Sequence, residues 1–251
     1  MRILFTLHPE GSVADSLWSV GLSGDRVVKY EFVIVVSTCF SVWTEQVRRF
    51  DHDYRRLEPR RIFERAFRTY GLPRAIRTDK GVPFATSGIH GLSQLNVWWM
   101  RLGIQHQRIH PGRPQQNGAH ERVHRTLKRG AIRPPRDNAA AQQRAFNRFR
   151  TEYNEERPHE TLGGQMPGSR YHPSPRSYPR VLPTQEYPGH FLVKKITTGG
   201  TFRFQHRLLN ISNSLTHHHI GLEETDDGIW SIYFNTVLLA KLDERDYIIR
   251  G

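Results

Sequence analysis

Residues 70–81, with the sequence YGLPRAIRTDKG, contain the short strand and the acidic residue around which the fold is predicted. The run 74–78 has strand composition and leads directly to Asp79. A carboxylate at the carboxyl end of a strand is well placed for a functional site, because such ends open onto the functional edge of α/β sheets. The alternative interpretation of Asp79 is an ordinary turn aspartate before glycine.

Helix and strand patterns alternate on both sides of this stretch. Before it, residues 58–70 place apolar side chains at helical spacing, and Gly71 follows as the expected C′ residue. After it, the pattern predicts a helix at 92–102 and a strand at 104–109. Further helices are predicted at 119–130 and 137–154. The candidate N-cap residues of the last helix are Asp137 and Asn138.

The two ends of the chain differ in composition from its middle. Residues 27–36 are rich in β-branched and aromatic residues and predict a strand. Residues 166–187 are proline-rich and predict an extended linker. Beyond them, residues 188–251 predict a small all-β barrel. Its evidence is four β-like runs, at 190–196, 201–209, 228–233 and 236–242, with hairpin signals at Gly199-Gly200 and Asp227-Gly228.

The charge of the chain indicates a polyanionic partner. The 251 residues carry a formal charge of +13 and a pI near 10.3, which favours nucleic acid over an ordinary solvated surface. No apolar run approaches the ~18 residues that a membrane span needs, so we expect no membrane partner. Cys39 is the single cysteine, which excludes a disulfide framework and favours a reducing, cytoplasmic setting.

Glu121 is the second candidate acid. It lies on one predicted helical face with Asn117, His124, Arg125 and Lys128. Residues 101–135 carry eight Lys or Arg side chains against this single acid. Two carboxylates among cations suit a Mg²⁺ or Mn²⁺ site beside a phosphate. The alternative is a glutamate that only stabilises the first turn of its helix.

Four stretches carry a family resemblance. Residues 70–81 resemble the second-aspartate motif of retroviral-integrase-type (DDE) transposases of bacterial insertion sequences. Residues 103–128, GIQHQRIHPGRPQQNGAHERVHRTLK, resemble their glutamate motif. YNEERPHETL at 153–162 and MPGSRY at 166–171 resemble the segments that follow. The resemblance covers roughly residues 57–185, with a weaker match through the tail.

The resemblance implies a ribonuclease-H-like integrase catalytic core, a mixed sheet flanked by helices, over residues 1–165. It implies metal-dependent DNA strand cleavage and transfer, with Asp79 and Glu121 as catalytic residues that bind Mg²⁺ or Mn²⁺. The implied partner is DNA, both transposon ends and target, and the implied state is a homo-oligomer, because two DNA ends must be brought together. The expected DNA-binding residues are Arg113, Arg125 and Lys128, with His110, Asn117 and His124 lining the site.

Residues 1–56 depart from the family pattern. The first core strand is expected to read Leu-Trp-x-x-Asp, whereas residues 17–24 read LWSVGLSG and place Gly21 where the first catalytic aspartate belongs. Either the segment is degenerate, or a substitute acid such as Asp15 or Asp25 serves. The usual N-terminal helix-turn-helix region also has no counterpart before Leu17. Two hypotheses follow: an impaired transposase, or a catalytically inactive DNA-binding remnant of one.

Overall fold

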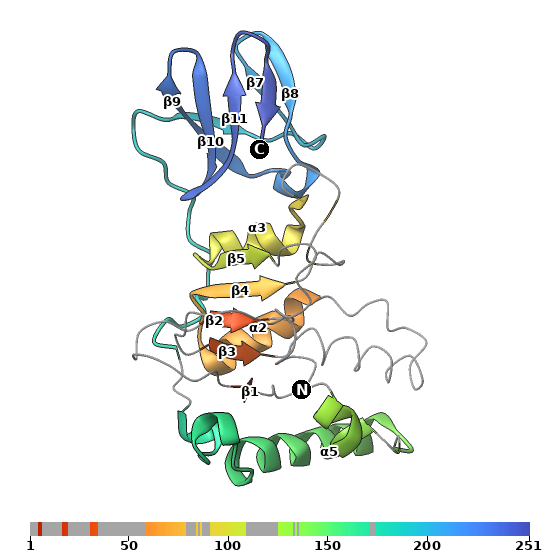
Figure 1. Ribbon diagram of the computed structural model, residues 1–251. Helices are drawn as coiled ribbons and strands as arrows, with labels where there is room; N and C mark the ends of the chain where they lie inside the picture. The colour runs from red at the N-terminus through yellow and green to blue at the C-terminus, as the bar shows by residue number, and fades with distance from the viewer. Residues whose placement is uncertain are drawn as a thin grey trace. The chain divides into compact units, whose positions relative to one another are not determined.

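The chain forms two compact units, each built from two separate stretches of sequence (Figure 1). Unit 1 comprises Met1–Asp79 and Ile104–Tyr178, and unit 2 comprises Lys80–Gly103 and Pro179–Gly251. The computed structural model describes residues 5–6, 17–19, 31–34, 59–78, 84, 86, 91–108, 125–132, 134, 136–170 and 174–251. Among the helices in these ranges, none combines the length and apolarity that crossing a membrane requires.

Unit 1 contains a five-stranded mixed sheet in the order β1-β3-β2-β4-β5. Its strands are β1 Phe5–Thr6, β2 Leu17–Ser19, β3 Glu31–Ile34, β4 Ala75–Thr78 and β5 Gln105–Arg108. β1 pairs with β3 antiparallel, whereas β3–β2, β2–β4 and β4–β5 are parallel. The arrows of β2, β4 and β5 therefore point the same way (Figure 1). The sequence predictions of a mixed sheet and of strands at β3, β4 and β5 are confirmed.

Helix α2, Pro59–Tyr70, supplies apolar side chains to the core of unit 1. Phe63, Ala66 and Phe67 share one helical face and are 1%, 2% and 0% exposed. The helix ends at Gly71, whose φ of +80° places it in the left-handed region, and whose N–H donates to the Phe67 carbonyl at 2.9 Å. Helix and terminator agree with the sequence prediction.

The first part of the proline-rich segment is bound to unit 1. The Ser174 hydroxyl donates to the Leu72 carbonyl at 2.6 Å, and the Leu72 N–H donates to the Arg176 carbonyl at 2.6 Å. The ring of Tyr178 stacks on Phe67 with 6.3 Å between centroids. This stretch is therefore extended but held in place by the turn between α2 and β4.

Two consecutive helical segments pack together in the second part of unit 1. The described part of the first covers residues 125–132 and ends in a π turn, η4, Lys128–Ile132. The second is α5, Ala139–Thr151, which continues as the π turn η5, Glu152–Glu156. Their shared core consists of Leu127, Ala131, Ile132, Phe149 and Tyr153. Short 3₁₀ turns follow at η6, Glu160–Leu162, and η7, Pro167–Arg170.

Unit 2 joins helix α3, Gln94–Arg101, to an all-β region. A five-stranded antiparallel sheet has the order β6-β9-β10-β11-β12, and β7 pairs with β8 in a separate hairpin. The strands are β6 Leu192–Lys195, β7 Thr201–Phe204, β8 Arg207–Asn210, β9 His219–Asp226, β10 Ile229–Phe234, β11 Val237–Asp243 and β12 Ile248–Arg250. The predicted turns at Gly200 and Gly228 have positive φ, +72° and +67°.

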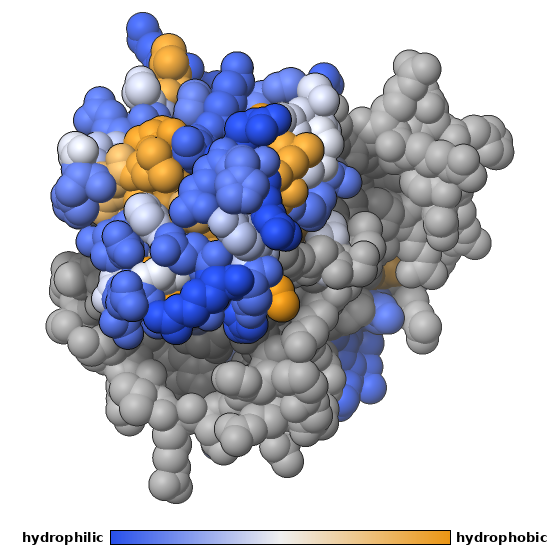
Figure 2. Space-filling model, turned by 90° about the horizontal axis from the view of Figure 1, so that it is seen from above, coloured by the Kyte–Doolittle hydropathy of each residue, from blue (hydrophilic) through white to orange (hydrophobic). Residues whose placement is uncertain are grey.

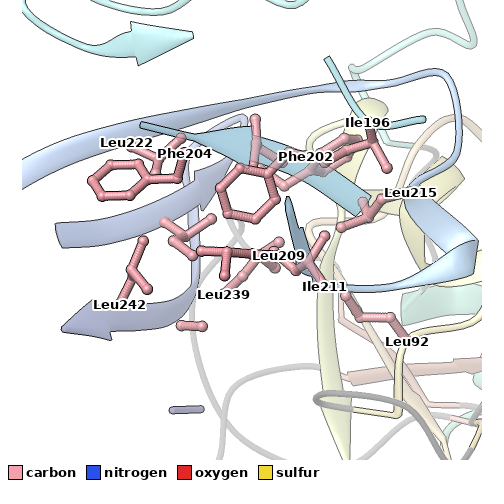
Figure 3. Packing of buried hydrophobic residues seen from close by; sticks show 14 of the residues in the cluster. Leu92, Ile196, Phe202, Phe204, Leu209, Ile211, Leu215, Leu222, Leu239 and Leu242 are labelled. Atoms are coloured by element: carbon pink, nitrogen blue, oxygen red, sulfur yellow. The ribbon is translucent and has the colours of Figure 1, made fainter. Parts of the chain in front are cut away.

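The expected C-terminal barrel is not confirmed. Within residues 188–251 the hydrogen-bonded ladder leaves β6 and β12 as edge strands, so the sheet does not close. The β7–β8 hairpin instead packs its Phe202, Phe204 and Leu209 into the same core as the larger sheet, beside Leu222 and Leu239 (Figure 3). Burial of these side chains, and not hydrogen bonding between strands, joins the hairpin to the larger sheet.

Two details of the β region differ from the sequence prediction. The run 201–209 is two strands, because Gln205, with φ of 49°, turns the chain back. Strand β9 was not predicted, because Gly221 interrupts the apolar pattern and its second half is acidic. Gly221 has a tertiary reason: a Cβ there would lie 2.6 Å from Cδ1 of Phe191.

On the face seen in Figure 2, hydrophilic side chains predominate and apolar side chains gather in patches between them. The large apolar side chains that remain exposed in unit 2 are Val181, Leu192, Val193, Leu208, Leu238 and Ile248. Four of them lie on the two edge strands, β6 and β12, and on β11, which pairs with β12. The patches are small, as is usual for a folded surface.

Candidate active site

The candidate site is built around the carboxyl end of β4. The strand ends at Thr78, so Asp79 is the next residue along the chain. In the parallel pairing of β4 with β2, Leu17 lies opposite Ala75 and Ser19 lies opposite Arg77. Because β2, β4 and β5 are parallel, their carboxyl ends meet at one edge of the sheet. The backbone thus places Thr78 at the edge where a parallel sheet carries its functional groups.

Most of the predicted site residues lie outside the described residues. These are Asp79, Glu121, Arg113, His110, Asn117, His124 and Gly21, together with Asp15 and Asp25. Their roles remain predictions. Two predicted DNA-binding residues, Arg125 and Lys128, are described.

Arg125 and Lys128 lie on the outer side of their helical segment. Leu127 and Ala131, each 1% exposed, face α5 and pack into the shared core. Arg125 is exposed and Lys128 is partly exposed. Within the described residues, no carboxylate forms an ion pair with either cation. Two cations that have no acidic partner in the described part of the chain are suited to contacting phosphate groups.

A close approach between Gly130 and Phe149 shapes this surface. A Cβ on Gly130 would lie 2.6 Å from Cδ2 and 2.7 Å from Cε2 of Phe149, closer than real side chains come. Phe149 is 5% exposed and stacks on Tyr153 with 5.7 Å between ring centroids. Gly130 therefore allows the helical segment that carries Arg125 and Lys128 to lie against α5.

The segment YNEERPH (residues 153–159) is buried at Tyr153 and Asn154 and exposed at residues 155–158. The ring of His159 meets Tyr153 edge-on at 4.6 Å, and Asn154 is 4% exposed. Burial and the nearby positive charge of Arg157 hold the pKa of His159 below its usual value. A Cβ on Gly168 of η7 would lie 2.8 Å from the Asn154 carbonyl, so η7 packs closely on η5. The described contacts of this segment are structural.

The histidine run 217–219 does not form a metal site. His217 and His219 are exposed, whereas His218 turns inward and meets the Phe234 ring edge-on at 5.5 Å. Burial lowers the pKa of His218, with smaller effects from Arg101 and the two neighbouring histidines. Among the residues that the structure describes, no three His, Cys, Asp or Glu side chains gather as metal ligands.

Positive charge is unequally divided along the chain. Residues 188–251 contain seven Lys or Arg and seven Asp or Glu, so they are neutral. The formal excess of +13 therefore lies wholly in residues 1–187. This division was not part of the sequence prediction. It directs the search for a polyanion-binding surface to residues 1–187.

Comparison with known proteins finds similarity within residues 1–187. Residues 102–167 match the family described as Integrase core domain. Over 118 residues, the chain is 30% identical to the 31.7 kDa protein of insertion element IS407 from Burkholderia multivorans, covering 47% of this chain and 40% of that protein. Over 99 residues it is 28% identical to the Pol polyprotein of Radiation murine leukemia virus, covering 39% of this chain and 16% of that protein.

A solved structure is also similar. One chain of the simian T-cell lymphotropic virus intasome, in complex with PP2A regulatory subunit B56 gamma, is 12% identical with a TM-score of 0.40. The likeness covers 94% of this chain and 83% of that chain. By sequence, the chain spans less than half the length of the curated relatives that it matches.

These matches define a class of protein. Residues 102–167 carry an integrase core domain, and the matched proteins belong to a bacterial insertion element and to retroviruses. Residues 102–167 are therefore similar to integrase core domains, as the sequence motifs predicted.

Proposed function

We propose that the protein is a DNA transposase of the integrase-core type, a class of polynucleotidyl transferase that cleaves DNA and joins the 3′ end to a target, and that its activity is impaired because Gly21 stands in place of the first catalytic aspartate. The observation that carries the proposal is the position of Asp79 directly after β4, in a sheet whose β2, β4 and β5 are parallel. The integrase core match over residues 102–167, which spans Glu121, supports it.

Asp79 and Glu121 are the residues we assign to hold Mg²⁺ or Mn²⁺. Carboxylate oxygens are the ligands that these hard cations prefer, and Asp79 is the residue that follows the end of β4 in sequence. Such ions activate an attacking oxygen and stabilise a leaving one. In the first step, water attacks phosphorus and releases a 3′ hydroxyl. In the second, that hydroxyl attacks a target phosphodiester, forming one P–O bond as another breaks.

We assign DNA backbone contacts to Arg125 and Lys128, together with Arg113, and we keep His110, Asn117 and His124 as residues lining the site. The exposure of Arg125 and Lys128 and the absence of an ion-paired acid among the described residues support this assignment. These cations orient the DNA phosphates and offset their charge.

Gly21 favours a second candidate, a DNA-binding protein without catalytic activity. Glycine supplies no ligand, and the loss of one of three acids removes part of the metal site. In sequence, Gly21 stands two residues after Ser19, and Asp79 stands two residues after Arg77, the residue paired with Ser19. This equal count supports Gly21 as the position of the first acid.

We propose residues 1–165 as the catalytic part, 166–187 as the connecting segment and 188–251 as a module that contacts a second subunit. The neutral charge of 188–251 supports contact with protein over contact with DNA. A homo-oligomer follows from the need to bring two DNA ends together.

The test is a strand-transfer assay with Mn²⁺ on short duplexes that carry the sequences flanking the gene. The native chain, Gly21→Asp and Gly21→Asp/Glu121→Gln are compared. We expect joining only by Gly21→Asp, which establishes the site and assigns the native chain to the DNA-binding candidate. Joining by the native chain directs the search for the first acid to Asp15 and Asp25. Activity that survives Glu121→Gln overturns the assigned site.

A further inference from the structure

Helix α5 has a basic face that the proposed site does not use. The helix, Ala139–Thr151, contains Arg144, Arg148 and Arg150 and no acidic residue. Arg144 and Arg148 are exposed, and Arg150 is partly exposed. This helix therefore carries a concentrated share of the positive charge of residues 1–187.

The two exposed arginines of α5 are not neutralised by the described part of the chain. Among the described residues, no carboxylate forms an ion pair with Arg144 or Arg148, and this includes Glu152, one turn after Arg148. Like charges four positions apart on a helix repel each other. A bound anion between them relieves this repulsion.

The opposite face of α5 is fixed by buried contacts. Gln142 is 3% exposed, and its Nε2 donates to the Ala131 carbonyl at 2.6 Å. Its Oε1 accepts from the Arg136 N–H at 3.3 Å. Phe149, 5% exposed, packs into the core shared with Ala131. The arginines are thus presented by a helix that is held against its neighbour, as a preformed binding surface requires.

This basic face points away from the other cationic face of unit 1. With 3.6 residues per turn, Arg144 lies about 160° around α5 from Gln142, which faces the helical segment 125–132. Arg125 lies about 160° around that segment from Leu127, which faces α5. Packed helices have axes about 8–10 Å apart, and each is about 10–12 Å across. Short DNA is straight, because its persistence length is about 150 base pairs, so a duplex on one side of this pair does not reach the other side.

The composition of the α5 face favours nucleic acid over a protein partner. None of the large apolar side chains that are exposed in the described part of the chain lies within residues 125–151. The centre of a protein–protein interface is apolar and poor in charge, whereas contacts to a DNA backbone need only donors and positive charge. Guanidinium groups match phosphate oxygens in geometry. A second copy of the same face carries the same charge and repels it.

We infer that Arg144 and Arg148 of α5 bind the phosphate backbone of a second DNA duplex, separate from the duplex at the candidate site. The inference deepens the proposed function and rests on it for the role of Arg125 and Lys128. A protein that joins a DNA end to a target holds two duplexes at once, and the two cationic faces offer a surface for each. Binding at α5 is independent of sequence, because phosphates carry no sequence information.

The number of duplexes bound per chain is the first readout. The full chain is titrated with a short labelled duplex, without metal and at protein concentrations far above the Kd. We expect two duplexes per native chain and one per Arg144→Gln/Arg148→Gln chain. Arg203→Gln/Arg245→Gln also removes two exposed positive charges, from the neutral residues 188–251, and should still bind two. Two duplexes on the Arg144→Gln/Arg148→Gln chain, or one on the native chain, overturn the inference.

The salt dependence of the second binding event is the second readout. Each phosphate contact contributes about 0.9 to the slope of log affinity against log salt. We expect Arg144→Gln and Arg148→Gln each to lower this slope by about 0.9, and Arg144→Lys/Arg148→Lys, which keeps both charges, to preserve it. A native slope in both single glutamine variants overturns the inference. An altered sedimentation coefficient of the DNA-free Arg144→Gln/Arg148→Gln chain with native DNA binding also overturns it, and assigns the face to a contact between copies.

These measurements separate the inference from the proposed function, because DNA binding is measured without catalysis. If Gly21→Asp does not join DNA, the proposed function fails, while the number of bound duplexes still decides the role of α5. If the α5 variants bind two duplexes with the native slope, the inference fails, while the assigned site at Asp79 and Glu121 is unaffected.

Discussion

Ser19 lies opposite Arg77 in the parallel pairing of β2 with β4. The relationship joins a segment that departs from the integrase family pattern to one that keeps it. In sequence, Gly21 and Asp79 each follow their member of the pair by two residues. Residues 17–19, which belong to the segment that departs from the family motifs, thus supply a strand to the sheet.

DNA affinity should depend on Arg125 and Lys128 through salt. Each lost phosphate contact reduces the slope of log affinity against log salt by about 0.9. We expect Arg125→Gln/Lys128→Gln to lower the slope by about 1.8 in anisotropy titrations at several NaCl concentrations. Arg203→Gln, in the neutral tail, is the control and should leave it unchanged. If the double variant had the same slope as the native chain, neither residue would contact DNA phosphates.

Replacing Gly130 with alanine should destabilise unit 1. The new Cβ would lie 2.6 Å from Cδ2 of Phe149, which is buried and has little room to move. Overpacking of this kind costs about 1–3 kcal/mol, more than the ~1 kcal/mol that alanine gains in a helix. Urea unfolding measures the difference. Gly189→Ala is the control and should have little effect, because a Cβ there meets nothing within 4 Å. Adding Phe149→Leu to Gly130→Ala should restore part of the lost stability.

Asn138 should matter more than Asp137 for α5. The Asn138 side chain accepts a hydrogen bond from the Ala141 N–H at 2.9 Å, so it is the N-cap of the helix. Asn138→Ala should cost about 1 kcal/mol of unfolding free energy. Asp137→Ala, at the exposed preceding residue, serves as the comparison. Equal losses in the two variants would contradict the capping assignment.

Stability should fall in mild acid, in part because of His218. Its folded-state pKa lies below the unfolded value near 6.5, chiefly because burial disfavours the charged ring. The unfolded state therefore binds more protons, so the contribution is complete above about pH 6.5 and is lost as the pH falls below it. His218→Gln should reduce the drop in melting temperature between pH 7.5 and pH 5. His217→Gln, at the exposed neighbour, should reduce the drop less, because His217 is only a minor cause of the lowered pKa of His218.

Local patterns in the sequence predicted several elements because their causes are local. The helical spacing of Phe63, Ala66 and Phe67, followed by Gly71 as a terminator, was sufficient to predict α2. The turn signals at Gly200 and Gly228 were sufficient for two hairpins, because only glycine adopts their backbone angles without strain. The integrase motifs were likewise visible in the sequence, and comparison with known proteins confirmed their class.

Other features depend on contacts between distant residues. β9 was not predicted because the glycine at 221 interrupts its apolar pattern. The close approach of Phe191, 30 residues away in sequence, leaves no room for a side chain at that position. A closed barrel was expected, whereas burial of Phe202 and Phe204 holds the β7–β8 hairpin without strand pairing to the sheet. No local pattern encodes either outcome, because the energy comes from packing between segments.

The sequence alone identified the resemblance to integrase cores, the candidate acids Asp79 and Glu121 and the glycine at position 21. Such assignments follow from residue identity and spacing. The tertiary structure alone decided that Ser19 pairs with Arg77 and that α3 belongs with the C-terminal β region. The reason is that strand register and helix docking are set by burial and by hydrogen bonds such as those of Ser214 and Asn235, between residues more than 100 positions apart.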